Sequence, residues 1–216
     1  MSTFRMKILV LGMIRTNCYI IYNDETKEAI VIDPADEAEK IEQYIKANDL
    51  VCKAILLTHG HFDHILAAEA LAGWTGAKLY AHEDEEQLLK DPGMNSSLSI
   101  RRECSLTCDV YLKDQEQLEL AGFQIRVIHT PGHTAGGVCY YFPGCAVLIS
   151  GDTLFRESIG RSDLPTGDGR QLVEAIHNKL MVLEDTVKVY PGHGEATTIG
   201  YERDNNVYLF HNSLYD

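Results

Sequence analysis

Short apolar runs alternate with amphipathic stretches along the first half of the chain. Runs rich in β-branched and aromatic residues predict buried strands, whereas apolar residues spaced three and four apart predict helices. The clearest helical pattern covers residues 38–47, where Ile41, Tyr44 and Ile45 share one face. We predict strands at residues 6–11, 17–22, 29–32, 54–57 and 78–81, and helices at residues 38–47, 65–71 and 83–90. The acidic run of the last helix is interpreted as a solvated face.

The second half of the chain is richer in strand pairs. We predict hairpins from residues 117–120 with 123–128 and from 138–142 with 146–149, a helix at 171–183, a strand at 187–190 and a short helix within 201–216. Residues 94–109 are polar and lack a period, which predicts a long loop of the kind that often acts as a lid. No linker divides the chain, so we expect one domain. This order of elements predicts an α/β fold in which two mixed sheets face each other and helices cover the outer faces, a four-layer αββα sandwich.

Charge and apolar content narrow the class of protein. The 216 residues carry a net charge of −13, and an acidic surface repels phosphate backbones, so no nucleic-acid partner is expected. No apolar run reaches the roughly 18 residues of a membrane span, and the run at residues 8–11 is too short for a signal peptide. We therefore expect no membrane partner and a cytoplasmic location. The six cysteines form no C-x-x-C pair and are expected to be reduced thiols, with a second zinc site or a redox pair at Cys104 and Cys108 left open.

The candidate chemistry centres on the hexapeptide His59-Gly60-His61-Phe62-Asp63-His64, which directly follows the strand predicted at residues 54–57. A lone histidine is usually structural, but three histidines and an aspartate in one strand-to-helix turn are typical of a metal site. His59 and His61 are two residues apart, so an extended backbone points both rings to one side. Asp63 and His64 fall where the chain turns and approach from the other flank. The hexapeptide therefore predicts two adjacent cation sites.

Three further candidate ligands, His133, Asp152 and His193, each lie at a predicted strand end and directly follow a glycine. Strand ends on one edge of a sandwich converge, so we expect these side chains to join the hexapeptide. The resulting set of five histidines and two aspartates suits two ions. One division places His59, His61 and His133 on the first ion and Asp63, His64 and His193 on the second, with Asp152 bridging both. Imidazole and carboxylate ligands suit zinc, iron or manganese.

Asp33 ends the strand predicted at residues 29–32 and directly precedes Pro34. Two interpretations remain open for it. It is either a turn residue or the acceptor that holds a ligand histidine in one tautomer.

The spacing His59-x-His61-x-Asp63-His64, followed in order by His133, Asp152 and His193, resembles the metallo-β-lactamase superfamily. That resemblance implies the αββα sandwich and a pair of divalent ions, most often zinc. Asp152 stands where the best-known zinc lactamases carry a cysteine, which disfavours antibiotic hydrolysis. Two segments, residues 151–155 and 190–194, are similar to glyoxalase II, the hydroxyacylglutathione hydrolase. The resemblance is to a compact form that fills residues 1–216 without a separate C-terminal helical substrate domain, and it implies that Arg161 contacts a glutathione carboxylate.

The resemblance implies hydrolysis of a small-molecule thioester, such as a glutathione conjugate. A water bridging two divalent ions loses a proton near neutral pH and becomes the nucleophile, and Asp63 is expected to accept a hydrogen bond that orients it. A thiolate leaving group needs little acid assistance, because the pKa of its parent thiol is about 8.5. The oligomeric state is left open.

A second reaction class stays open because Gly160-Arg161-Ser162-Asp163 also resembles the glutathione persulfide dioxygenases of the same superfamily. Such an enzyme would use a single iron on His59, His133 and Asp152. A nuclease is disfavoured by the acidic charge. A purely structural metal domain is disfavoured by the complete ligand set and the long loop at residues 94–109.

Overall fold

The computed structural model describes residues 3–210 and contains two six-stranded sheets. The first sheet has its strands in sequence order, and its bounds are β1 (Phe4–Leu11), β2 (Thr16–Asn23), β3 (Glu28–Ile32), β4 (Val51–Leu56), β5 (Lys78–His82) and β6 (Val110–Leu112). The β1–β2 and β2–β3 pairs are antiparallel, and the pairs from β3 to β6 are parallel. Parallel strands put their carboxyl ends at one edge, so β3, β4 and β5 all deliver their following loops to the same side of the sheet.

The second sheet has the order β14-β13-β10-β9-β8-β7. Its bounds are β7 (Gln117–Leu120), β8 (Phe123–His129), β9 (Val138–Phe142), β10 (Val147–Gly151), β13 (Lys188–Pro191) and β14 (Thr197–Thr198). Within it, β10 and β13 are parallel, whereas the other pairs are antiparallel. A small third sheet pairs β11 (Leu154–Phe155) with β12 (Ser158–Ile159).

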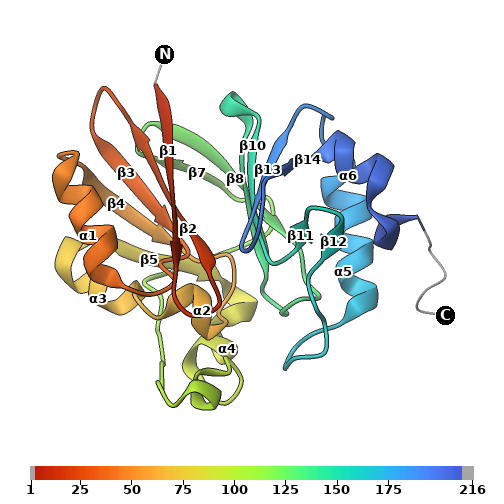
Figure 1. Ribbon diagram of the computed structural model, residues 1–216, viewed down its shortest axis with the longest axis horizontal. Coiled ribbons are helices and arrows are strands. Elements are labelled where there is room, and N and C mark those ends of the chain that lie inside the picture. Colours follow the sequence, from red (N-terminus) through yellow and green to blue (C-terminus); the bar gives the residue numbers. More distant parts are fainter. Residues whose placement is uncertain (1–2, 211–216) are drawn as a thin grey trace.

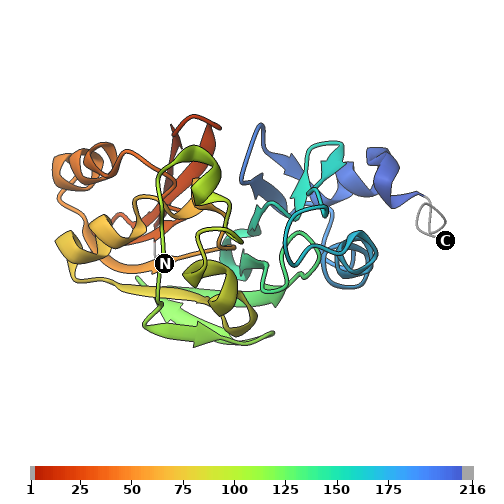
Figure 2. The ribbon, with the colours of Figure 1, turned by 90° about the horizontal axis from the view of Figure 1, so that it is seen from below.

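Helices cover both outer faces, so the predicted four-layer αββα sandwich is confirmed (Figures 1 and 2). The helices are α1 (Ala38–Ala47), α2 (Phe62–Ile65), α3 (Ala68–Thr75), α4 (Glu86–Lys90), α5 (Gly169–Ala175) and α6 (Ile199–Asn205). In Figure 1, α1 and α3 lie on one side of the paired sheets, and α5 and α6 lie on the other. Among residues 3–210, no helix combines the length and apolar character that a membrane span requires.

Three apolar cores separate these layers, and alternate residues of one strand serve different cores. In β3, Ile30 and Ile32 pack between the two sheets, whereas Val31 faces outward and packs with Ile41 and Ile45 of α1. The third core joins the second sheet to α5 and α6. Because both faces of β3 are buried, its sequence reads as a continuous apolar run, which is how it was predicted.

The helix predicted at residues 65–71 is wrong in its boundaries, because the structure breaks it into α2 and α3. At the break, the backbone N–H of Leu66 donates to Ala35 as well as to Phe62, and that of Ala67 donates to Pro34. The loop after β3 therefore competes for the donors that would continue α2. Periodicity does not report such a long-range contact.

Other boundaries also differ from prediction. The helix predicted at 171–183 begins earlier, at α5, and continues as a π-helical segment, η4 (Ile176–Leu180), in which Met181 N–H donates to Ile176. The loop predicted at 94–109 contains a 3₁₀ turn, η2 (Ser97–Ile100). The strand β6 and the two-residue strands β11, β12 and β14 were not predicted, because they are too short to show a period. Of the segment predicted to end the chain, residues 211–216 lie outside the described residues.

Candidate metal centre

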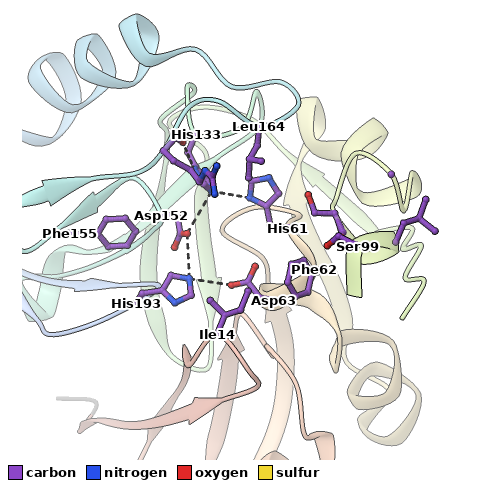
Figure 3. Close-up of a pocket in the computed structure, with 14 residues that line it drawn as sticks. Ile14, His61, Phe62, Asp63, Ser99, His133, Asp152, Phe155, Leu164 and His193 are labelled. Carbon is purple, nitrogen blue, oxygen red and sulfur yellow. Dashed lines mark hydrogen bonds and ion pairs between the residues drawn. The ribbon is translucent and has the colours of Figure 1, made fainter. Parts of the chain in front are cut away.

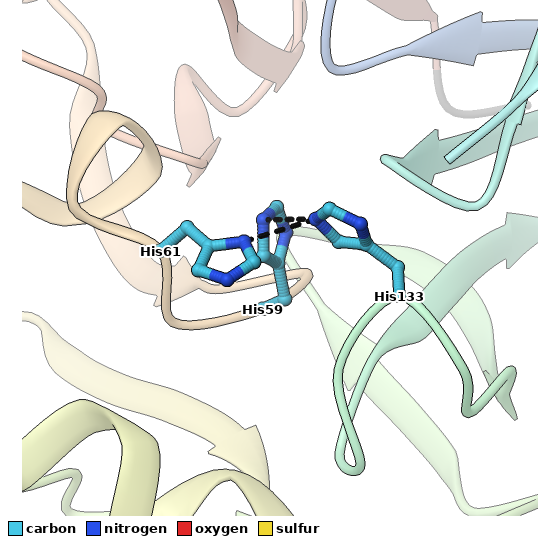
Figure 4. A group of neighbouring side chains, drawn as sticks. All are labelled: His59, His61 and His133. Atoms are coloured by element: carbon cyan, nitrogen blue, oxygen red, sulfur yellow. Dashed lines mark hydrogen bonds between the residues drawn. The ribbon is translucent and has the colours of Figure 1, made fainter. Parts of the chain in front are cut away.

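The seven predicted ligand residues meet at one end of the sandwich. Figure 3 labels His61, Asp63, His133, Asp152 and His193, and Figure 4 labels His59. The hexapeptide follows β4 of the first sheet, whereas the loops after β8, β10 and β13 of the second sheet bring the other three side chains. Each of these strands ends at the same rim. Residues separated by more than a hundred positions in the sequence therefore form one cluster.

The first group consists of His59, His61 and His133, whose rings converge (Figure 4). His133 Nε2 lies 2.9 Å from His61 Nδ1 and 3.2 Å from His59 Nε2. All three side chains are buried. Three nitrogen atoms at this spacing, with no carboxylate among them, match one half of the predicted ligand division.

The second group consists of Asp63, His64 and His193. Asp63 Oδ2 lies 3.4 Å from His64 Nε2 and 3.2 Å from His193 Nε2. Asp152 Oδ1 lies 3.4 Å from His64 Nε2, and its Oδ2 lies 3.5 Å from His193 Nε2 and 3.7 Å from His133 Nε2. The carboxylate thus approaches ligands of both groups, as predicted for a bridge, although both of its oxygens lie nearer to the second group.

Two buried polar atoms show that this cluster fits a cation. His64 Nε2 and Asp152 Oδ1 have no hydrogen-bond partner, although both are buried and face each other. Leaving such atoms unsatisfied is costly unless a ligand completes them. Gly192 keeps the approach open, because a Cβ there would lie 2.1 Å from Asp152 Oδ1 and 2.6 Å from His64 Cε1. The cluster therefore suits divalent metal ions, and the assignment of each residue as a ligand remains our proposal.

The electrostatics of the two groups differ. Burial and the neighbouring imidazoles lower the pKa of His59 and lower that of His61 to about 3, so these rings are neutral and ready to bind a cation. In the second group, burial lowers the pKa of each histidine, but the neighbouring carboxylates stabilise the protonated ring more strongly and raise the pKa above its usual value. Hydrogen bonds to Asp152 and Asp63 raise the pKa of His193 to about 9, and the same carboxylates with Asp33 raise the pKa of His64.

This difference predicts how metal affinity changes with pH. Before metal binds, the proton on His193 stabilises the fold fully below pH 6.5, and that stabilisation is lost as pH rises through about 9. A cation must displace this proton, so affinity for the second ion should rise up to about tenfold per pH unit between neutral pH and about 9. Competition with a chromophoric chelator at several pH values measures it. An affinity independent of pH over this range would contradict the assignment of His193.

Asp33 holds one of the ligands in place. Its Oδ2 lies 2.9 Å from His64 Nδ1, and the carboxylate also accepts from the backbone N–H and the hydroxyl of Thr58. The residue is fully buried, follows β3 directly and has a φ of 50°. Of the two interpretations left open for Asp33, the histidine acceptor is confirmed, whereas the structure assigns no turn at this residue. The hydrogen bond to Nδ1 directs His64 Nε2 towards the cluster.

Sequence reasoning missed a buried carboxylate that joins the two halves of the site. Glu85 lies in the 3₁₀ turn η1 (Glu83–Glu85), within the acidic run interpreted as a solvated face, and that interpretation is wrong for this residue. Its Oε1 accepts from Gly60 N–H and its Oε2 from Gly136 N–H, both at 2.8 Å. Gly60 belongs to the hexapeptide and Gly136 to the loop that carries His133. One side chain thus fixes the distance between two ligand loops.

Replacing Glu85 with glutamine should weaken this connection, because the amide NH₂ then faces a backbone N–H in place of an acceptor. We expect the free energy of unfolding to fall by about 2 kcal/mol, and metal affinity to fall about tenfold. Chemical denaturation and metal titration measure both quantities. Glu86→Gln is the matched control, since its exposed carboxylate pairs with Lys90 and, among residues 3–210, forms no hydrogen bond to either ligand loop. Equal behaviour of the two variants would show that the connection is unimportant.

The sequence suggests only a structural role for His82, and this stays a prediction, because His82 groups with Asp84 and His129 at a spacing that could also hold an ion. Its ring is buried, stacks on His129 with centroids 3.9 Å apart, and accepts from the backbone N–H of Asp84. No role was predicted for His177 or His211, and His211 lies outside the described residues. Cys104 and Cys108, like the other four cysteines, are free thiols.

The cluster forms the floor of a cavity of about 840 Å³ (Figure 3). Asp63 faces this cavity and its Oδ2 accepts from Thr16 Oγ1 at 2.8 Å, a contact that the sequence did not reveal. Arg161 also lines the cavity, and its guanidinium makes two hydrogen bonds to Asp163, at 2.7 and 2.8 Å. Its predicted contact with substrate stays a prediction. Its carbonyl oxygen accepts from His133 Nδ1 at 2.7 Å, so Arg161 also orients a candidate ligand.

Comparison with known proteins agrees with this geometry. Residues 11–193 match the family model described as the metallo-beta-lactamase superfamily. The hydroxyacylglutathione hydrolase GloC of Haemophilus influenzae is 36% identical over 210 residues, covering 94% of this chain and 97% of that protein. Among solved structures, BLEG-1 B3 metallo-beta-lactamase is 43% identical with a TM-score of 0.91, covering 96% of this chain and 100% of that one. TTHA1623 in a di-iron-bound form is 33% identical with a TM-score of 0.85, covering 94% and 100%. The family match over most of the chain, the shared fold and the His/Asp cluster together show that the chain belongs to the metallo-β-lactamase superfamily.

Proposed function

We propose that the protein hydrolyses a small-molecule thioester, such as an acylglutathione, with the aid of two divalent metal ions. The observation that carries this proposal is the position of Asp152 between two groups of ligands at the floor of a substrate-sized cavity. Membership of the superfamily supports a metal-dependent hydrolase, and the similarity to GloC favours a thioester as the substrate. Zinc is our proposed metal, with iron and manganese as alternatives.

The side chains of the site suit this reaction. Two bound ions would polarise the thioester carbonyl and lower the pKa of a water held between them. Asp63, oriented by Thr16, presents a carboxylate that can accept a proton or a hydrogen bond from that water. Arg161 lines the cavity, and its guanidinium would have to exchange the Asp163 carboxylate for a carboxylate of the thiol portion in order to bind it. The departing thiolate is a good leaving group, with a parent pKa of about 8.5, and needs no strong general acid.

Hydrolysis of β-lactams is the second candidate, because BLEG-1, at 43% identity, is described as a B3 metallo-beta-lactamase. A β-lactam and a thioester both present a carbonyl to the same cluster. The persulfide dioxygenase alternative requires only one iron, and the complete second group of ligands weighs against it. The net charge of −13 continues to disfavour a nucleic-acid substrate.

Three assays on the metal-loaded protein separate these candidates. We expect S-lactoylglutathione to release free thiol, measured with a chromogenic thiol reagent, at a higher kcat/KM than a chromogenic cephalosporin is opened. Oxygen uptake with glutathione persulfide should be absent. Fast cephalosporin opening without thioester cleavage would replace the proposal with a lactamase. Oxygen uptake by a protein that holds one iron would replace it with a dioxygenase.

A further inference from the structure

Two large aliphatic side chains stand exposed at the rim of the cavity that contains the metal cluster. Ile14 is 47% exposed and Leu98 is 50% exposed, and both line the cavity. They lie on separate loops, the turn between β1 and β2 and the 3₁₀ turn η2. Because Ile14 and Leu98 line the same cavity, they can offer apolar surface to one bound ligand. We call these two residues the aliphatic rim, and the aromatic ring of Phe62 lines the same cavity.

Both loops that carry the aliphatic rim are joined to the rest of the fold by hydrogen bonds of neighbouring residues. Two residues after Ile14, Thr16 is buried and bonds to Asp63. The loop that carries Leu98 is anchored by the buried side chain of Asn95, which donates to the carbonyl oxygen of Cys104, and Asn95 O accepts from Phe62 N–H. A surface that is ordered before binding loses little conformational entropy when it binds a ligand.

The same loop is fixed at its far side by an ion pair. The guanidinium of Arg102 makes two hydrogen bonds to the carboxylate of Asp36, at 2.6 and 3.0 Å. Asp36 lies in the segment between β3 and α1. The loop of Leu98 is thus joined by one hydrogen bond within itself, from Asn95, and by an ion pair to the segment between β3 and α1.

Ile14 of the aliphatic rim and the backbone of Arg161 lie on different flanks of the cluster. Ile14 lies next to Asp63 and His193, whereas His133 lies beyond Asp152 on the other side (Figure 3). Arg161 is tied to that other side, because its carbonyl oxygen accepts from His133 Nδ1. A thioester whose carbonyl sits at the cluster therefore has Ile14 on one flank and the Arg161–Asp163 ion pair, with Leu164, on the other.

We propose that the aliphatic rim binds an apolar acyl group of several carbons, so that medium-chain acyl thioesters are preferred over acetyl or lactoyl thioesters. This inference rests on the proposed thioester hydrolysis and specifies its acyl group. The thiol portion, with its carboxylates, then lies towards Arg161. The cavity, at about 840 Å³, is within the range of about 300–1,000 Å³ that accommodates ligands of this size.

Kinetics with substrates that share glutathione as the thiol and differ only in the acyl group test the preference for longer acyl chains. S-hexanoylglutathione and S-acetylglutathione differ by four methylene groups, and each fully buried methylene is worth about fourfold in affinity. We expect kcat/KM of the metal-loaded protein to be at least about 10-fold higher for the hexanoyl substrate, which corresponds to about half of the added chain being buried. Equal values for the two substrates would overturn the proposal while leaving thioester hydrolysis intact.

Variants locate the preference on the aliphatic rim. The double substitution Ile14→Ser with Leu98→Ser should lower kcat/KM for the hexanoyl substrate about 10-fold and change that for the acetyl substrate less than about twofold. Val182→Ser is the matched control, because Val182 is 71% exposed and is absent from the lining of the cavity. An equal loss on both substrates in the double variant would overturn the role of the aliphatic rim.

A binding measurement separates failure of this inference from failure of the proposed function. S-hexylglutathione and S-methylglutathione are thioethers, which the protein cannot hydrolyse, and calorimetry gives their Kd values. We expect the hexyl compound to bind at least about 10-fold more tightly, and the double variant to abolish the difference. If this difference is found but no acylglutathione is cleaved, the proposed reaction is wrong and the aliphatic rim stands. If hydrolysis is found without the difference, the aliphatic rim is wrong.

Discussion

Asp152→Ala should bind one divalent ion in place of two and lose at least about 10³-fold in kcat for thioester hydrolysis. The Asp152 carboxylate approaches both groups, with His64 and His193 on one side and His133 on the other. Removing it leaves the second group with a single carboxylate, Asp63, and breaks the link between the ions. Metal analysis after dialysis and a thioester assay measure the two effects.

Asp204→Ala is the matched control for this variant. Asp204 is an exposed carboxylate on α6, outside the cavity lining, so its loss should change neither metal content nor turnover. Circular dichroism and thermal unfolding of Asp152→Ala verify that it folds. An Asp152→Ala protein that keeps two ions and full turnover would show that this carboxylate is not a bridge.

Asp33→Asn should have the second-largest effect on metal binding, although Asp33 would act on a bound ion only through His64. The amide can still occupy this position, because asparagine tolerates the positive φ of 50° found there. It cannot supply the charge and the paired acceptors that Asp33 gives to His64 and Thr58. Loss of a carboxylate that orients a ligand histidine typically weakens metal binding about 10- to 100-fold, and we expect that range here.

Asp49→Asn provides the comparison for Asp33→Asn. Asp49 has a φ of 54° but is exposed, and it makes no contact with the metal cluster. Metal titration of both variants separates the loss of the histidine acceptor from the cost of changing an aspartate with a positive φ. Equal metal affinity in Asp33→Asn and the unsubstituted protein would show that His64 is oriented without this hydrogen bond.

Features that depend on neighbouring residues in the chain were predictable from the sequence. The helix predicted at residues 38–47 coincides with α1, because its apolar face follows a regular helical period. The hexapeptide packs four candidate ligands into one turn, so its local spacing alone indicates cation binding. The three remaining candidates were identifiable because each lies at a strand end after a glycine, and strand ends converge in this fold.

Features that depend on long-range contacts were not predictable. Glutamate is usually found at the surface, and Glu85 lies in an acidic run. Only the approach of Gly60 and Gly136, from two different loops, makes Glu85 a buried acceptor. Thr16 bonds to Asp63 across 47 positions of sequence. The break after α2 depends on carbonyl groups of Pro34 and Ala35. None of these partners can be found from periodicity or local spacing.

The number of metal ions that each chain binds tests directly whether the seven candidate ligands hold a pair of ions. The protein should be purified without added metal or chelator, saturated with zinc and dialysed, and its ions counted per chain by mass spectrometry of the elements. We expect two divalent ions per chain, one for each group of ligands around Asp152. A single ion per chain at saturation would contradict the paired centre, and with it the proposed hydrolysis.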